Sequence, residues 1–167
     1  MTDHLDRILE QWRIEKPHLD ASPMAVIGRL SRASAAINSR LAITFAKHEL
    51  DSSSFDVLAT LLRSGTPYCL TPAVLARDSM ISTSAVAQRL NKLESRSLVT
   101  RKVNPDDGRG TLVALTPAGR TLIEEALPDH LATEHAITGL LTKAEQAQLA
   151  TLLQKLADGA GGQSAGK

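Results

Sequence analysis

Two short helices separated by only three residues constrain this fold more than any other feature of the sequence. Thr71-Pro72 can start a helix over residues 73–78, because a hydroxyl can cap a helix and proline tolerates its first turn. Three residues further on, Ser82 can cap a second helix that runs through Ser95. Two short helices joined by so tight a turn predict a helix-turn-helix.

A β-hairpin is predicted directly after these helices. Residues 98–103 and 111–115 are rich in β-formers, and the tract between them, NPDDGRG, consists of turn-forming residues. A helix-turn-helix followed by a hairpin is a winged helix-turn-helix. We therefore expect a mainly α fold with a small β wing.

Apolar residues at helical spacing predict further helices on both sides of this block. They comprise a short helix around residues 5–12 that stops before Pro17, a long helix from Pro23 to about Glu49, a helix capped by Ser52–Ser54 that ends at Ser64-Gly65, a helix from Thr116-Pro117 that is interrupted at Pro128, and a last helix from the capping box Thr142–Glu145 to about Ala157. Residues 66–70 are expected to form a loop.

The net charge of +1 hides an uneven distribution along the chain. Residues 77–109 hold seven basic and four acidic side chains, whereas residues 1–20 and 117–158 are both acidic overall. This pattern suits a centre that binds a polyanion, although a basic face is also ordinary solvated surface. The few aromatic residues are scattered, which argues against a stacking platform for single-stranded nucleic acid.

Several other classes of protein are disfavoured. No apolar run is long enough to cross a bilayer, so we expect a cytoplasmic protein with no membrane partner. The single cysteine cannot form an internal disulfide or a structural zinc site. The histidines form no metal-ligand spacing, and there is no phosphate-binding loop or nucleophile motif. We expect no enzyme and no cofactor.

Residues 75–119, LARDSMISTSAVAQRLNKLESRSLVTRKVNPDDGRGTLVALTPAG, resemble the winged helix-turn-helix of the MarR family. The similarity includes S-x-S-A-V-x-x-R-L-x-x-L in the second helix, D-D-x-R-G in the wing and the closing L-T-P-A-G. Two positions depart from the family pattern. Ser97 stands where a glycine is usual, so a left-handed turn with modest strain is expected there. Gly108 stands where a second wing arginine is common, which removes one possible phosphate contact.

The resemblance implies a transcriptional regulator, a repressor, that binds palindromic double-stranded DNA through the second helix and the wing. Hydroxyl and amide side chains at the start of that helix can reach base edges in the major groove, and an alanine there can meet a thymine methyl. An arginine at the wing tip, held by Asp107, can enter the minor groove. The predicted DNA-binding residues are Ser82, Thr83, Ser84, Ala85, Gln88, Arg89, Arg101, Lys102 and Arg109.

The resemblance also implies a homodimer. Apolar positions at both ends of the chain exceed what one small winged domain can cover, so helices from both ends should pack against a second copy. We expect one unit over residues 1–158, with dimerisation helices at 1–49 and 117–158 and the winged helix-turn-helix at 52–116. A flexible tail is expected at 159–167.

Trp12, Asp56, Arg89 and Arg101 together resemble the urate-responsive, HucR- and PecS-like branch of the family. By this resemblance Trp12 and Arg89 would hold a small planar anion such as urate. Asp56 and Arg101 would form an ion pair that the ligand breaks. Other compact anions, such as xanthine-like, phenolic or citrate-like molecules, also suit two arginines.

Alternative interpretations remain open at this point. Trp12 can be a packing anchor, and Asp56 can lie exposed at the first turn of its helix. Cys69 suggests a thiol-based sensor, and His130 and His135 suggest pH-sensitive DNA binding. A winged-helix module that mediates interactions without binding DNA is the alternative from a different class.

Overall fold

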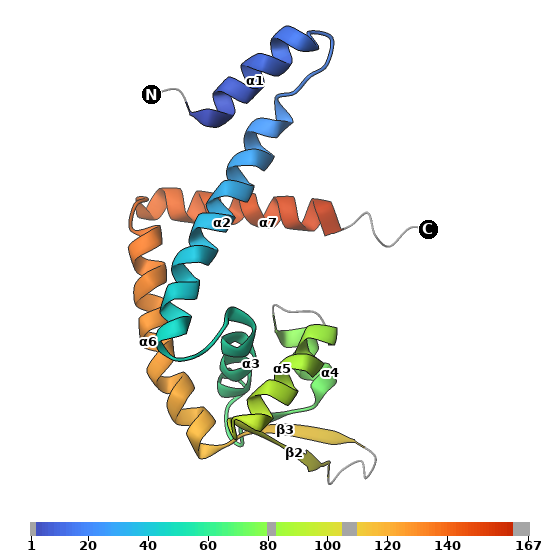
Figure 1. The fold of residues 1–167 in the computed structure, drawn as a ribbon, viewed down its shortest axis with the longest axis vertical. Helices are drawn as coiled ribbons and strands as arrows, with labels where there is room; N and C mark the ends of the chain where they lie inside the picture. The colour runs from blue at the N-terminus through green and yellow to red at the C-terminus, as the bar shows by residue number, and fades with distance from the viewer. Residues whose placement is uncertain (1–2, 80–82, 105–109, 162–167) are drawn as a thin grey trace.

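A computed structural model describes residues 3–79, 83–104 and 110–161. Helices form most of this chain, and a small antiparallel sheet lies at one end (Figure 1). The elements are α1 (His4–Glu15), α2 (Pro23–Lys47), α3 (Ser52–Arg63), β1 (Cys69–Leu70), α4 (Pro72–Asp78), α5 (Thr83–Ser95), β2 (Val99–Val103), β3 (Thr111–Leu115), α6 (Pro117–Thr138) and α7 (Lys143–Gly161). The predicted mainly α fold with a small β wing is confirmed.

Helices α3, α4 and α5 and the three strands pack into one unit, which we call the winged lobe. The sheet has the order β1-β3-β2, and β2 and β3 form the predicted hairpin from Val99 paired with Leu115 to Val103 paired with Thr111. Apolar side chains from all three helices and the sheet fill its core together with Ile123 and Ala126 of α6 and Phe45 of α2. The fully buried members include Val57, Leu58, Leu61, Leu75, Leu93, Val113 and Ile123.

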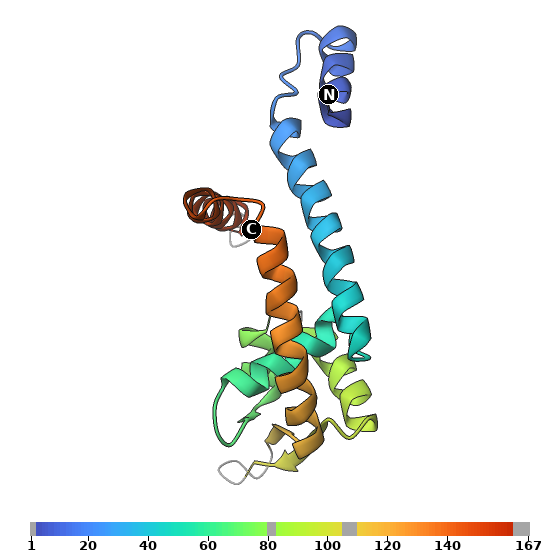
Figure 2. The ribbon, with the colours of Figure 1, turned by 90° about the vertical axis from the view of Figure 1, so that its left-hand side faces the viewer.

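Helices α2 and α6 extend from the winged lobe and lie side by side (Figures 1 and 2). Helix α1 folds back onto the start of α2, where Leu5 is buried against Gly28 and Arg29 pairs with Asp6 at 2.6 Å. Helix α7 turns away from the end of α6, and Figure 2 shows it end-on, to one side of α2. No helix within the described residues is long and apolar enough to span a membrane.

Two expectations about helix ends are wrong. The cap of α3 is Asp51 rather than Ser52–Ser54, because its carboxylate accepts a hydrogen bond from the Ser54 backbone N–H at 2.8 Å. Pro128 does not interrupt α6, although proline removes one backbone hydrogen bond and crowds the preceding turn. Buried Ile123 and Ala126 lie just before it and hold this part of α6 against the core.

Two other boundaries also differ from the expectation. Helix α7 continues to Gly161, so residues 159–161 of the expected tail are helical, and residues 162–167 lie outside the described part of the chain. The expected loop before the helix-turn-helix contains β1, in which Cys69 pairs with Ala114 of β3. A strand of two residues shows no alternating pattern that sequence could reveal.

The connection from α5 to the wing depends on a left-handed turn. Ser97 has φ of 57°, and the N–H groups of Ser97 and Leu98 donate to the carbonyls of Glu94 and Leu93, both at 2.9 Å. These two bonds form a Schellman motif, which usually places glycine where Ser97 lies. The predicted left-handed turn at this departure from the family pattern is therefore present.

Gly119, in the first turn of α6, lets that helix approach the same turn. A side-chain carbon at this position would overlap the carbonyl oxygen of Leu98, which is backbone and cannot move aside cheaply. Gly119→Ala should therefore lower the free energy of unfolding by about 3 kcal/mol or more, in the range of strained and overpacked sites. Urea unfolding would measure this change.

Gly159→Ala is the matched control, because a side-chain carbon there meets nothing within 4 Å. Alanine favours a helix, so this variant should be neutral or more stable by up to about 1 kcal/mol. Equal effects of the two substitutions would contradict the close approach of α6 to the Leu98 turn.

Candidate DNA-binding surface and adjoining cavity

Helix α5 packs through one face and presents the other to solvent. Val86, Leu90 and Leu93 are buried in the core, whereas Ser84 and Gln88 lie on the exposed side. Of the other predicted contact residues on this helix, Ala85 is half-buried, Thr83 is the first helical residue and Ser82 lies outside the described residues. The start of α5 therefore offers hydroxyl and amide groups on a rigid, exposed helix, as reading a major groove requires.

The wing strand β2 lies beside α5 and carries two exposed cations, Arg101 and Lys102. Arg101 Nη1 donates to Glu94 Oε2, and its Nη2 donates to Asn91 Oδ1, both at 2.6 Å. The expected pair of Arg101 with Asp56 is therefore not the arrangement of this structure. Arg109, with Asp107, lies outside the described residues.

Arg89 also has a partner that the sequence did not reveal. Its Nη1 lies 3.1 Å from Asp51 Oδ2, and Lys92 Nζ lies 2.8 Å from the same oxygen. Burial alone would raise the pKa of Asp51, but hydrogen bonds from Lys92 and Ser54 and the charge of Arg89 outweigh it and lower that pKa to about 2. Asp51 thus stays ionised while it caps α3 and binds α5.

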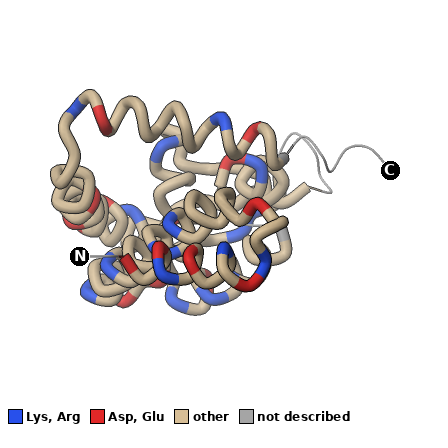
Figure 3. Tube along the Cα trace, turned by 90° about the horizontal axis from the view of Figure 1, so that it is seen from above, with Lys and Arg blue, Asp and Glu red and all other residues tan. Residues whose placement is uncertain are grey.

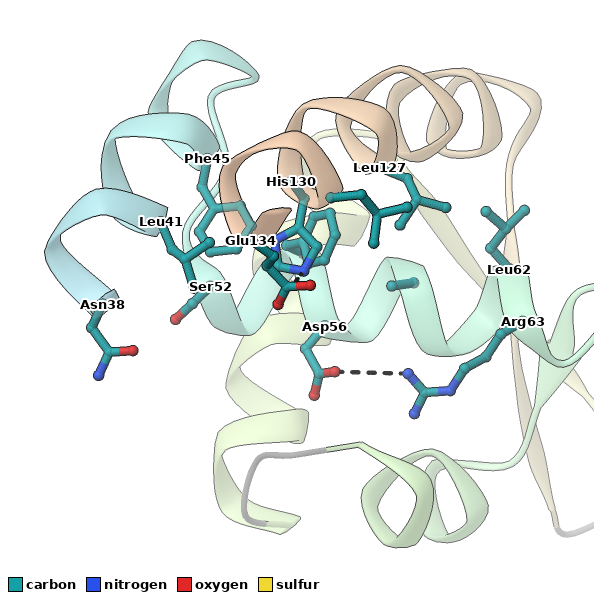
Figure 4. Close-up of a pocket in the computed structure, with 13 residues that line it drawn as sticks. Asn38, Leu41, Phe45, Ser52, Asp56, Leu62, Arg63, Leu127, His130 and Glu134 are labelled. Atoms are coloured by element: carbon teal, nitrogen blue, oxygen red, sulfur yellow. Dashed lines mark ion pairs between the residues drawn. The ribbon is translucent and has the colours of Figure 1, made fainter. Parts of the chain in front are cut away.

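A cavity of about 660 Å³ lies between the winged lobe and the helices α2 and α6 (Figure 4). The rings of Phe45, Phe55 and His130 line one part of it, with centroids 4.5–5.4 Å apart; Phe45 stacks on His130, and Phe55 is tilted against both. The residues around it come from α2, α3 and α6. They are Asn38, Leu41, Phe45, Ser52, Phe55, Asp56, Ala59, Leu62, Arg63, Leu127, His130, Leu131 and Glu134.

Several polar groups line this cavity beside the rings. Asp56 Oδ1 faces Arg63 Nη1 at 4.0 Å, and His130 Nε2 faces Glu134 Oε1 at 3.2 Å. His130 Nδ1 is buried and makes no hydrogen bond within the described part of the protein. An aromatic wall with donors and acceptors beside it suits a flat molecule with polar edges.

Of the four residues expected to form a ligand site, only Asp56 lines this cavity. Trp12 is 41% exposed on α1, which packs on the opposite end of α2. Arg89 and Arg101 lie on α5 and β2 with the partners given above. A single chain therefore does not bring the four residues together. Asp56, Arg89 and Arg101 belong to α3, α5 and β2 of the winged lobe, whereas Trp12 belongs to α1, which packs on α2.

The remaining candidate residues lie elsewhere in the fold. Cys69 is half-buried in β1, and His135 is exposed on α6 near the cavity residue His130. The structure tests neither a thiol sensor nor pH-sensitive DNA binding, which stay predictions. In the described ranges, no three His, Cys, Asp or Glu side chains gather in a way that could hold a metal ion.

Comparison with known proteins identifies the family. Residues 48–110 match the model of the MarR family. The HTH-type transcriptional regulator PecS of Dickeya dadantii (strain 3937) is 37% identical over 149 residues, which cover 89% of this chain and 90% of PecS. The chain belongs to the MarR family.

Two solved MarR-like structures share the fold at more than 25% identity. BpsR of Bordetella bronchiseptica, whose DNA binding is regulated by 6-hydroxynicotinic acid, aligns with a TM-score of 0.72 and 28% identity over 80% of this chain and 93% of its own. A mutant MarR from E. coli in complex with operator DNA aligns with a TM-score of 0.70 and 26% identity over the same shares. The protein is thus a DNA-binding transcriptional regulator with a winged helix-turn-helix.

The low pKa of Asp51 predicts a pH-dependent stability. The carboxylate stabilises the folded state above the unfolded value of 3.8, and this stabilisation is lost as the pH falls through about 2. Asp51→Asn keeps the cap, since asparagine and aspartate cap equally well, but it removes the charge. At neutral pH the variant should lose about 0.5–1 kcal/mol, a modest value because the Asp51 side chain is 37% exposed and solvent screens it.

Urea unfolding at several pH values would measure this difference, which should shrink as the pH falls below about 4. Asp158→Asn, on the exposed end of α7, controls for the general loss of a carboxylate. A difference between Asp51→Asn and wild type that is the same at every pH would exclude the proposed charge interaction.

Proposed function

We propose that this MarR-family regulator is a homodimeric repressor that binds an inverted-repeat operator and is released by a small planar anion, with urate as the first candidate. One observation carries the proposal. The start of α5 is exposed, the basic strand β2 packs beside the same helix, and a cavity lies between the winged lobe and the helices expected to form the dimer. The MarR of E. coli, solved with operator DNA, supports the DNA-binding part.

The dimer is supported by apolar side chains that one chain leaves exposed. Soluble monomers rarely expose large contiguous apolar patches, and here such side chains follow α1, α2 and α7. Residues 146–154 of α7 contain no Lys, Arg, Asp or Glu, and Figure 3 shows this uncharged stretch in the middle of the helix. The exposed residues include Trp12, Met24, Val26, Ile27, Leu30, Ile37, Leu149, Leu152, Leu153 and Leu156. Burying them requires a partner, and a second copy supplies the same surface.

The ligand response is supported by the place of the cavity. A molecule bound among α2, α3 and α6 contacts both the dimerisation helices and the winged lobe, so it can favour one relative orientation of the two. The DNA binding of the related BpsR is regulated by 6-hydroxynicotinic acid, which, like urate, is a flat ring that carries a negative charge. In the proposed dimer, the exposed Trp12 of one copy can contact the other copy and a ligand bound there.

Replacing Arg109 tests the role of the wing. Arg109→Ala should weaken operator binding and lower the slope of log affinity against log salt by about one, because one cation near a phosphate is lost. Fluorescence anisotropy with a labelled operator at several salt concentrations would measure both quantities. Arg13→Ala, on α1 and paired with Glu10, is the control and should change neither. Unchanged binding by a folded Arg109→Ala dimer would show that the wing is not used.

Tryptophan fluorescence tests the ligand. Trp12 is the only tryptophan, so urate bound beside it should quench the protein's indole emission. Binding should also raise the melting temperature and release DNA, since a ligand that prefers the DNA-free state opposes operator binding. Arg89→Ala should abolish both the quenching and the rise in melting temperature. Asp56→Asn should still bind urate but release DNA less completely. An intact operator complex with neither quenching nor a melting shift would exclude urate, and Trp12 would then be a packing anchor.

A further inference from the structure

Basic side chains in the second half of α5 and directly after it contact the turn between α2 and α3, and this turn contains Asp51. Arg89 and Lys92 lie three residues apart on one face of α5, and Arg96 follows its last residue, Ser95. The turn, residues 48–51, joins a dimerisation helix to the winged lobe. The arrangement connects the two parts of the molecule by charge and hydrogen bonds in addition to the apolar core.

The contacts involve the second half of α5 and the residue that follows it. Arg89 Nη1 and Lys92 Nζ share Asp51 Oδ2 at 3.1 and 2.8 Å. Directly after α5, Arg96 Nη1 donates to the backbone carbonyl of Glu49 at 2.6 Å, and its Nη2 lies 3.5 Å from Glu49 Oε2. All three cations are therefore engaged within the protein. Arg89, which the sequence suggested for DNA or ligand, is one of them.

Asp51 has a second task at the same place. Its other carboxylate oxygen accepts the Ser54 backbone N–H at 2.8 Å, so the side chain is fixed at the start of α3 and cannot follow α5 freely. We propose that Asp51 is a positioning residue, which sets the place of α5 relative to the dimerisation helices and so keeps the two recognition helices of a dimer in register with DNA. This inference rests on the proposed reading of DNA by α5.

The same turn adjoins the cavity. Ser52, the residue after Asp51, and Phe45, just before the turn, both line it. A molecule that displaces these two residues would move Asp51 and, through Arg89 and Lys92, α5. The link thus offers a route from an occupied cavity to the DNA-binding face that does not need the expected pair of Asp56 and Arg101.

Charge and position predict opposite effects on DNA binding. Removing a carboxylate from a surface that faces phosphates should by itself strengthen binding, because the local charge becomes more positive. Removing a positioning contact should weaken it. Asp51→Asn separates the two, because it deletes the charge and keeps the α3 cap.

The experiment measures operator affinity of the full-length dimer by fluorescence anisotropy at fixed salt. Asp51→Asn should bind about 2- to 5-fold more weakly than wild type, the change in affinity that matches the modest stability of this contact, with an unchanged salt slope since no phosphate contact is lost. Asp78→Asn is the matched control in the same lobe, where the carboxylate pairs with Arg77, and it should bind as wild type or more tightly. Affinity of Asp51→Asn equal to or above that of wild type would overturn the proposal.

Two further measurements keep the test decisive. In a double-mutant cycle, Lys92→Gln should cost much less affinity in the Asp51→Asn background than in wild type, and additive effects would contradict the link. Amide hydrogen exchange of the DNA-free dimer should be faster in α5 of Asp51→Asn and unchanged in α7. Failure of wild type to bind any operator would reject the proposed function, whereas unchanged exchange in α5 would reject the role of Asp51.

Discussion

The burial of α3 is the interaction on which the rest of this structure depends. Val57, Leu58 and Leu61 are completely inaccessible, and the helix packs against α2, α4, α5, α6 and β3. One apolar core therefore serves both the winged lobe and the bases of the two long helices. Because such an interior is closely packed, a shift of α2 or α6 cannot be absorbed locally and must displace the neighbours of α3. The positions of α5 and of the cavity both follow from this one packing arrangement.

Around that core, apolar burial is unevenly distributed along the chain. The winged lobe holds most of the buried residues, whereas residues 31–40 of α2 and nearly all of α7 are exposed in a single chain. Helices with uncovered apolar faces gain little from their own chain, so most of their stability must come from association. In the proposed dimer, folding of the extended helices and assembly of two copies are in this sense one process, and stability should depend on protein concentration.

The sequence predicted features that are set by local chemistry. The hairpin, the caps at Thr71 and Thr116, the capping box at Thr142 and the left-handed Ser97 all depend on residues close together in the chain. Features that depend on distant residues were not predictable in the same way. The pairs of Asp51 with Arg89 and of Arg101 with Glu94 arise from how α3, α5 and β2 pack. Three consecutive serines after Asp51 also hid the true cap, because each is an equally good candidate by sequence.

The contact between Gly119 and Leu98 makes the wing and α6 move as one body. Helix α6 has 22 residues, which corresponds to a length of about 33 Å at 1.5 Å per residue. If two copies meet near the far end of α6, a rotation of this helix about that end moves the winged lobe at its other end. A rotation of about 5° at that end displaces the lobe by about 3 Å, close to the 3.4 Å separation of stacked base pairs. Small angular changes between subunits are thus amplified into steps as large as one base pair.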